Sequence, residues 1–332
     1  MTETNGGAPD LSVIIVNYNS TEDLRACLAS IDRETAGIGF EVIVVDNASS
    51  GDGLDSVRAS FPRVRFITNA VNRGFAAANN QGIAVARGRY LQLLNPDTEI
   101  LDGALQKTVA FMKDHPRAGV VGCRLVFGDR RLQRSVGTFP SVLSLFLESS
   151  FLYLLLPRFA LIGRNGVSRF DYASDAEVDW VLGAFLLIRR EVVDRIGLLD
   201  EQFFVFTEEV DFCRRTKEAD FQVWYTPSAT VVHHCGAVRA LSQRTLLWTF
   251  ASQILYFKKH HRGWERRVLI LLKYLGMLVR IPVHFLVGLV TFNRALLARS
   301  RYWIYAVYRL LTTRLDYQTD LRGEVVPWTK IL

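Results

Sequence analysis

The stretch LSVIIVNYNSTEDLRACLASI, residues 11–31, places a short β-branched run directly before an amphipathic run that opens on Ser20. Residues 11–19 predict a strand, and Ser20 suits the N-cap of a helix over 20–31. A second strand follows at FEVIVVDNAS, residues 40–49. Strand, helix and strand in this order form the repeating unit of a parallel sheet with helices on both faces.

The same alternation continues through the first hundred residues. Residues 64–69 and 90–95 predict two more strands, with an alanine-rich helix between them at 74–86. The strands are continuously apolar, as expected where both faces of a sheet are covered. We therefore expect an α/β chain with a doubly wound, mostly parallel sheet.

Polar side chains follow each of these four predicted strands, namely Asn17, Asp46, Asn69 and the run from Asn95 to Asp97. Ligands of open α/β sheets lie beyond the carboxyl ends of the strands. Any one of these residues could simply begin a turn, but four in succession favour a ligand site. The chain contains neither GxGxxG nor GxxxxGK[ST], which disfavours a hydride-transfer enzyme and a kinase. Arg73, just before the predicted helix, offers a forked donor for a phosphate.

A group of carboxylates begins another predicted helix. Thr207 is an expected N-cap for a helix over about 208–218, which places Glu208, Glu209 and Asp211 in the first turn. The pattern suits a capped structural helix, and it also suits a general base held beside aromatic side chains that exclude water.

Two histidines, His233 and His234, end a later β-branched run. With Asp97 they would form a mixed carboxylate and imidazole metal site, although such histidines are often structural. The four cysteines, Cys27, Cys123, Cys213 and Cys235, are too scattered for a disulfide framework or a CxxC zinc site. A reducing, cytoplasmic setting is therefore expected.

Together these segments resemble the family-2 inverting glycosyltransferases with the GT-A fold, and specifically their bacterial rhamnosyltransferase-like branch. The matching motifs lie within residues 11–236 and are, in order, SVIIVNYN, VIVVDNAS, NRGFAAANNQG, LLNPDTE, DWVLGAFLLIRREVVDRIGLLDEQFFVFTEEVDFCRR and VVHHCG. The resemblance implies transfer of a sugar, with inversion, from a nucleotide diphosphate to a hydroxyl. L-Rhamnose from dTDP-L-rhamnose is the first choice, with UDP-galactofuranose or a UDP-hexose as alternatives. A non-catalytic protein that binds sugar nucleotides or glycans on the same scaffold is the rival from another class.

The same resemblance implies roles for individual residues. Donor contacts would come from Asn17, Asp46, Asn69, Arg73, Asn79, Asn95 and Asp97, and acceptor contacts from Trp180, Gly183, Ala184 and Asp211. Asn-Pro-Asp stands where the family has its DxD motif, so Asp97 would hold Mg²⁺ or Mn²⁺ with His233 or His234. The family's His-x-x-Gly spacing selects His233. The family usually has Glu-Asp-Val-Asp where this chain has Glu-Glu-Val-Asp, so the base would be Glu209, with Glu208 as the alternative.

The net charge of +7 is unevenly distributed. From residue 239 onward there are 16 Lys and Arg against 4 Asp and Glu, and subtraction from totals of 40 and 33 leaves 24 and 29 before it. We expect a GT-A domain over 1–238, with a nucleotide-sugar half at about 10–100 and an acceptor and catalytic half at about 101–238. A basic, amphipathic helical region would follow over 239–332.

The basic region suggests a membrane surface as a partner. Lys259, Arg266, Lys273 and Arg280 recur every seven residues, which on one helix would form a narrow stripe between apolar residues. Such a pattern favours an anionic membrane over a nucleic acid. Charges inside the apolar stretch 268–292 favour a helix lying in the interface over one that crosses it. We expect a peripheral protein on the cytoplasmic face of the cell membrane. Its acceptor would be a polyprenyl-diphosphate-linked saccharide, and the chain could form a homo-oligomer. A second apolar patch, 143–162, would be core or would face lipid.

Overall fold

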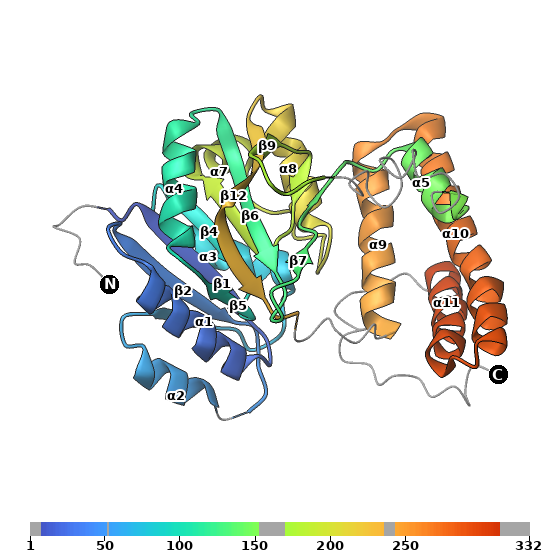
Figure 1. The fold of residues 1–332 in the computed structure, drawn as a ribbon, viewed down its shortest axis with the longest axis horizontal. Coiled ribbons are helices and arrows are strands. Elements are labelled where there is room, and N and C mark those ends of the chain that lie inside the picture. Colours follow the sequence, from blue (N-terminus) through green and yellow to red (C-terminus); the bar gives the residue numbers. More distant parts are fainter. Residues whose placement is uncertain (1–7, 52, 153–169, 236–242, 313–332) are drawn as a thin grey trace.

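The computed structural model describes residues 8–51, 53–152, 170–235 and 243–312. Its body is a twisted sheet with helices on both faces, and a group of helices stands beside it (Figure 1). The strands are β1 (Leu11–Asn17), β2 (Phe40–Asp46), β3 (Arg65–Thr68), β4 (Tyr90–Leu94), β5 (Thr98–Ile100), β6 (Ala118–Val126), β7 (Leu132–Gln133), β8 (Val136–Gly137), β9 (Ala176–Glu177), β10 (Trp180–Val181), β11 (Phe185–Arg189) and β12 (Gln222–His233). The helices of the body are α1 (Thr21–Glu34), α2 (Gly53–Ser60), α3 (Phe75–Val85), α4 (Ala104–Asp114), α7 (Arg190–Ile196) and α8 (Glu208–Glu218).

The main sheet has the strand order β3-β2-β1-β4-β11-β6-β12-β5, with β7 beside β6 and β9 beside β12. Strands β3, β2, β1 and β4 are parallel neighbours, as are β6 and β12, while β11 runs antiparallel between β4 and β6. Asn17 lies opposite Asp46, and Asp46 opposite Thr68. The predicted α/β fold with a mostly parallel sheet is confirmed, and the carboxyl ends of its parallel strands share one edge.

Alternate residues of the strands enter two cores, one on each face of the sheet. Val13 and Ile15 pack in the core under α1, α2 and α4. Ile14 and Val16 pack in the core under α3, α7 and α8. This double burial accounts for strands that are apolar at every position.

The apolar run 178–193 is not the single strand that its composition suggests. It forms β10, a turn, β11 and then α7 from Arg190. The chain leaves the sheet at Arg189, whose guanidinium is buried and donates to the Ala118 and Met112 carbonyls at 2.9 and 2.6 Å. The change from strand to helix therefore follows from a long-range anchor.

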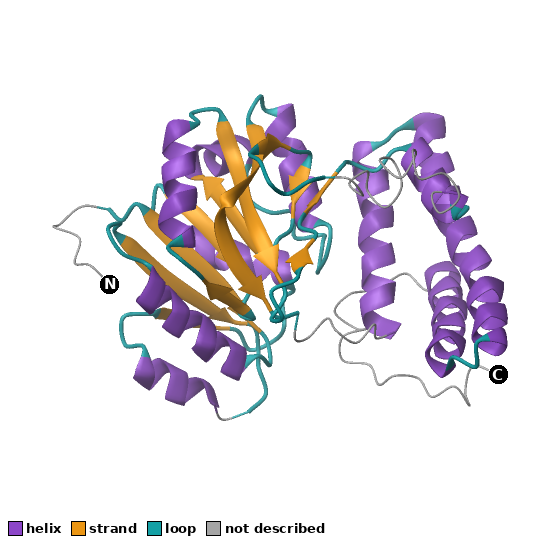
Figure 2. Ribbon diagram, in the orientation of Figure 1, coloured by secondary structure: helices purple, strands orange, loops and turns teal. Residues whose placement is uncertain are grey.

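The helical group beside the body consists of α5 (Val142–Ser149), α9 (Gln243–His260), α10 (Gly263–Val290) and α11 (Arg294–Thr312). Figure 2 shows these helices standing apart from the sheet layers. Helix α5 comes from the middle of the chain, yet it packs against α10, where Arg280 Nη2 donates to the Glu148 carbonyl at 3.3 Å. The described part of the 143–162 patch thus belongs with the C-terminal helices, while its remainder from 153 lies outside the described residues.

The predicted single stripe of cations is wrong. Lys259 lies in the last turn of α9, whereas Arg266, Lys273 and Arg280 lie in α10, which begins after a break at 261–262. Lys273 is buried, with its Nζ 4.4 Å from the Phe250 ring, and Arg280 pairs with Glu148 at 3.6 Å. Lys259, Lys273 and Arg280 each contact an acid or an aromatic ring of the protein, whereas Arg266 is exposed.

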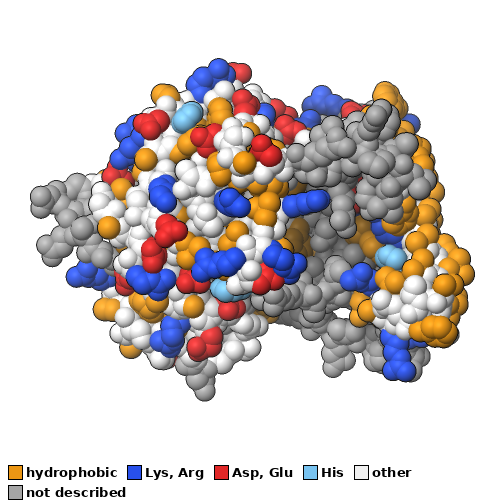
Figure 3. All heavy atoms as spheres, in the orientation of Figure 1, with side chains coloured by type: hydrophobic (Ala, Val, Ile, Leu, Met, Phe, Trp, Pro, Cys, Tyr) orange, Lys and Arg blue, Asp and Glu red, His pale blue; other side chains and the backbone are white. Residues whose placement is uncertain are grey.

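The outward face of α10 is apolar instead. Leu271, Leu275, Leu278, Phe285 and Leu289 fall on one helical face, and each is 44–56 % exposed. Figure 3 shows this apolar surface at the helical end of the molecule. By length and composition, α10 could also cross a membrane.

Candidate active site

The tips of β1 and β2 are joined by a buried hydrogen bond. Asn17 Nδ2 donates to Asp46 Oδ1 at 2.8 Å and to Ser49 Oγ at 3.1 Å. Asp46 also accepts from the backbone N–H of Ser49 at 3.2 Å. Asn17 and Asp46, both predicted to contact the nucleotide sugar, thus lie side by side at the carboxyl edge of the sheet. Their hydrogen bonds hold them in place without a ligand.

Asn47, which sequence reasoning passed over, shapes the loop that carries Arg73. Its Nδ2 donates to Asn72 Oδ1 at 2.8 Å, and its Oδ1 accepts from Asn69 Nδ2 at 3.1 Å and from the Arg73 backbone N–H at 2.9 Å. Asn69 therefore stabilises this loop through its hydrogen bond to Asn47, and the Arg73 side chain is exposed at the surface of the loop. The signal for Asn47 was its position directly after Asp46 at a strand tip.

The two asparagines of α3 differ in what they bind. Asn79 Nδ2 donates to the Phe75 carbonyl of the same helix at 2.9 Å. Asn80 ties α3 to the segment before α8, accepting from the Leu199 N–H at 3.1 Å and donating to Glu201 at 3.0 Å. Because this contact of Asn79 is within its own helix, we do not include it among the residues proposed to bind the nucleotide sugar.

The tips of β4 and β12 bring together a carboxylate and an imidazole. Asp97 Oδ1 lies 3.4 Å from His233 Nε2, and Asn95 Nδ2 lies 3.4 Å from the same nitrogen. Burial lowers the pKa of His233, but the Asp97 carboxylate outweighs it and the pKa rises to about 9. His234 is exposed and turns toward Glu99, at 3.9 Å. The strand thus presents His233, and not His234, to Asp97.

This pair fits a divalent cation. Gln133 Oε1 lies 3.1 Å from His233 Nδ1 and can accept from Nδ1–H, so a cation bound between His233 and Asp97 would displace only the proton on Nε2. Within the described residues, no group of three or more His, Cys, Asp and Glu side chains is placed to hold a metal. Two protein ligands suit Mg²⁺ or Mn²⁺ at a nucleotide site, where phosphate oxygens and water complete the shell.

Glu208 and Glu209 begin α8, as expected, although Thr207 provides no side-chain cap. Burial raises the pKa of Glu209 to about 7, against backbone N–H groups that favour its charged form. Burial and the neighbouring Glu209 raise the pKa of Glu208 well above its usual value. The Oε2 atoms of both residues are buried without a hydrogen-bond partner among the described residues. With a pKa of about 7, Glu209 can exchange a proton near neutral pH, as a general base must.

The turn at Gly183 and Ala184 lies between Glu209 and the strand tip that leads to Asp97. The backbone N–H of Asn95 donates to the Ala184 carbonyl at 3.0 Å. A Cβ on the neighbouring Gly183 would lie 3.6 Å from Glu209 Cβ and 4.0 Å from its carboxyl carbon. That is ordinary contact, so packing within the protein does not require glycine here. Trp180, in β10, is instead tied to the Thr138 carbonyl at 3.0 Å.

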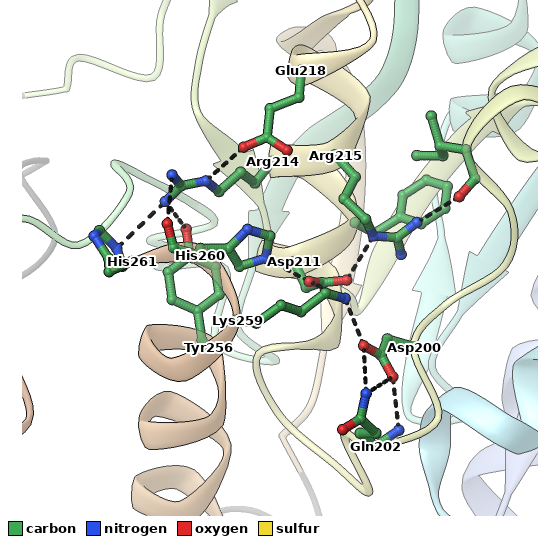
Figure 4. Close-up of polar contacts among 12 residues, drawn as sticks. Asp200, Gln202, Asp211, Arg214, Arg215, Glu218, Tyr256, Lys259, His260 and His261 are labelled. Atoms are coloured by element: carbon green, nitrogen blue, oxygen red, sulfur yellow. Dashed lines mark hydrogen bonds and ion pairs between the residues drawn. The ribbon is translucent and has the colours of Figure 1, made fainter. Parts of the chain in front are cut away.

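Asp211 lies at the centre of a buried charge cluster (Figure 4). Its carboxylate is fully buried and lies 2.8 Å from Arg215 Nε, 2.7 Å from Lys259 Nζ and 2.6 Å from His260 Nε2. Burial opposes ionisation of Asp211, but His260, Arg215 and Lys259 outweigh it and lower the pKa of this carboxyl to about 2. Because its oxygens are occupied, we assign Asp211 a structural role and omit it from the proposed acceptor contacts.

Comparison with known proteins gives the family. Residues 12–196, more than half of the chain, match the family model described as Glycosyl transferase family 2. The chain belongs to glycosyl transferase family 2. This transferase is 26 % identical over 268 residues to N-acetylglucosaminyl-diphospho-decaprenol L-rhamnosyltransferase of Mycobacterium tuberculosis, which covers 77 % of this chain and 86 % of that protein. It is 30 % identical over 238 residues to the uncharacterized protein y4gI of Sinorhizobium fredii, covering 70 % of this chain but only 25 % of that longer protein.

A solved structure supports the fold of the transferase. The mannosyltransferase PcManGT from Pyrobaculum calidifontis, in complex with GDP-Man and Mn²⁺, superposes with a TM-score of 0.58 at 16 % identity. The superposition covers 93 % of this chain and 89 % of that one. The predicted GT-A fold and the predicted resemblance to rhamnosyltransferases are both confirmed.

Proposed function

We propose that this transferase moves a sugar, with inversion, from a nucleotide diphosphate to a hydroxyl of a lipid-linked saccharide. The observation that carries the proposal is a chain of contacts. Glu209 lies beside Gly183, the next residue Ala184 accepts from the Asn95 N–H at 3.0 Å, and Asp97, two residues after Asn95, faces His233. This chain links the proposed base to the proposed site for a charged leaving group, and displacement of a diphosphate needs both. L-Rhamnose from dTDP-L-rhamnose is the proposed donor, supported by the mycobacterial relative.

Each residue has a distinct task in the proposed reaction. Asp46 binds the nucleoside, with the buried Asn17 holding its carboxylate in place, and Arg73 approaches the diphosphate. Asp97 and His233 would hold Mg²⁺ or Mn²⁺, which neutralises the diphosphate as it leaves. The Glu209 carboxylate accepts the proton of the acceptor hydroxyl as that oxygen attacks the anomeric carbon. Inversion needs one such base, and charge develops on the sugar ring as in glycoside hydrolysis.

Donor identity is tested by thermal unfolding of the full chain with a panel of sugar nucleotides and Mn²⁺. A ligand present at about 100 times its Kd stabilises the folded state by about 2.7 kcal/mol. We expect dTDP-rhamnose to raise the melting temperature most, and chelator to remove the shift. A larger shift with UDP-galactofuranose or a UDP-hexose would replace rhamnose as the donor, and no shift with any of them would contradict the proposed function.

We also propose that the outward face of α10 lies in the interface of the cytoplasmic membrane. Exposed arginines stand at both ends of this apolar face, with Arg262, Arg266 and Arg267 at its start and Arg294 after its end. Guanidinium groups beside an apolar face suit anionic lipid head groups. The inward side of α10 packs on α5, α9 and α11, which favours lying on the membrane over crossing it. A lipid-linked acceptor would then meet the enzyme at the same surface.

Flotation with liposomes checks this placement. The parent protein should float with anionic vesicles, and less so in high salt. Replacing Arg262, Arg266 and Arg267 by Gln should weaken binding about a hundredfold, because each cation contributes about 1 kcal/mol near an anionic surface. Leu275→Glu with Phe285→Glu should abolish it. Binding to neutral vesicles that survives alkaline extraction would indicate a crossing helix, and no binding to either vesicle would contradict the membrane placement.

A further inference from the structure

We propose that α9 positions the start of α8, and with it the base Glu209, and that Lys259 and His260 are positioning residues for transfer. The proposal rests on the proposed function and extends it, since it makes the C-terminal helices part of the catalytic arrangement as well as a membrane contact. Neither residue touches the reacting atoms. Both act through Asp211, one turn or less from Glu209.

The junction that leads into α8 is held in an unfavourable backbone conformation. Phe206 and Thr207 have φ angles of 67° and 74°, in the left-handed region that side chains other than glycine rarely adopt. Each such residue costs about 1–3 kcal/mol and persists only where the surroundings enforce it. Thr207 supplies no side-chain cap. The position of Glu209 therefore depends on contacts from outside α8.

After the junction, α9 supplies two of those contacts. Lys259 Nζ lies 2.7 Å from Asp211 Oδ1 and 2.6 Å from Asp200 Oδ2, so a single ammonium ties together the chain on both sides of the junction. His260 Nε2 lies 2.6 Å from Asp211 Oδ1. Arg215, the third partner of Asp211, belongs to α8 itself and cannot fix that helix against α9. Figure 4 shows Asp200, Asp211, Lys259 and His260 converging at this point.

Before the junction, α9 supplies hydrogen-bond and apolar contacts. Ser252 Oγ donates to the Val205 carbonyl at 2.9 Å, immediately ahead of Phe206. Phe203 is fully buried in one core with Tyr256 and Phe257 of α9. Helix α9 thus contacts the chain on both sides of the junction. The charged contacts come from its last turn, through Lys259 and His260.

Two adjacent lysines of α9 provide a matched test. Lys259→Met removes the ammonium that bridges Asp200 and Asp211, whereas Lys258→Met removes a neighbouring exposed one. In the full chain, Lys259→Met should lower kcat about a hundredfold, the scale on which a small misplacement of a catalytic group acts, and leave the donor KM unchanged. Lys258→Met should match the parent. Lys259→Arg should recover part of the lost rate.

Loss of folding is separated from loss of position in two ways. Asp211→Asn combined with Lys259→Met removes the buried charge together with its partner, so this double variant should melt near the parent temperature yet keep the low kcat. Hydrogen exchange of the 203–213 amides should be faster in Lys259→Met than in Lys258→Met. Parent-like exchange and kcat in Lys259→Met, or a low kcat explained by its unfolded fraction alone, would overturn the proposal. If the proposed function is wrong, no variant transfers sugar, the parent included, and the exchange comparison still decides the role of α9.

Discussion

Replacing Glu209 by Gln is expected to lower the rate of transfer by about 10²–10⁴-fold, because the amide keeps the shape of the side chain but cannot accept a proton. Donor affinity should be nearly unchanged, since the proposed donor contacts lie at the strand tips. Glu208→Gln is the matched control. Burial and the neighbouring Glu209 raise the pKa of Glu208 well above its usual value, which favours its neutral form, so its replacement by Gln should retain most of the rate. Initial rates and calorimetric donor binding measure both effects.

The pH dependence follows from the raised pKa of Glu209. A base must be ionised, so the rate of the parent should fall as pH drops through about 7, and the residual rate of Glu209→Gln should not show this fall. Through its raised pKa, Glu209 contributes most to stability below its ordinary pKa, and this contribution is lost as pH rises through the folded value of about 7. Glu209→Gln should therefore unfold at a higher temperature than the parent at pH 8. An inactive Glu208→Gln beside an active Glu209→Gln would move the base to Glu208, and full turnover in both would remove the base role from this pair.

Replacing Asp97 by Ala should remove the part of donor affinity that depends on metal, because a strand-tip carboxylate is the principal oxygen ligand offered to the cation. His233→Ala should weaken metal-dependent binding, and His234→Ala should change it little, since His234 faces Glu99. Gln133→Leu, which removes the partner of His233 Nδ1, should lower metal affinity about 10–100-fold. Calorimetry with and without Mn²⁺ gives these values. Equal donor affinity of the parent protein in chelator and in Mn²⁺ would contradict the metal site.

The ligand edge could be predicted from the sequence because the topology leaves little choice. Parallel strands joined by helices place Asn17, Asp46 and Asn95 at one edge whatever the details of packing. The family spacing favoured His233 over His234, and the structure supports that choice, since neighbouring residues of a strand face opposite ways and His233 is the one that meets Asp97. Adjacent glutamates on a helix pose the same problem, and the position of Glu209 beside Gly183 supports its assignment as base, which the two Gln variants test.

The C-terminal region shows where sequence periodicity misleads. A seven-residue repeat of cations predicts a stripe only if one helix carries all of them, and here a break at 261–262 separates Lys259 from the other three. The repeat also says nothing about buried partners. Asp211 receives Lys259 from a helix 48 positions further along the chain, a contact that no local pattern records.

The most direct test of the account is the product itself. The full chain is incubated with dTDP-rhamnose, Mn²⁺ and a polyprenyl-diphosphate-linked N-acetylglucosamine acceptor, and the anomeric configuration of the new linkage is determined by NMR. The account predicts a glycoside of configuration opposite to that of the donor, formed by the parent and not by Glu209→Gln. A product that retains the donor's configuration, or no transfer from any nucleotide sugar tested with this acceptor, would contradict it.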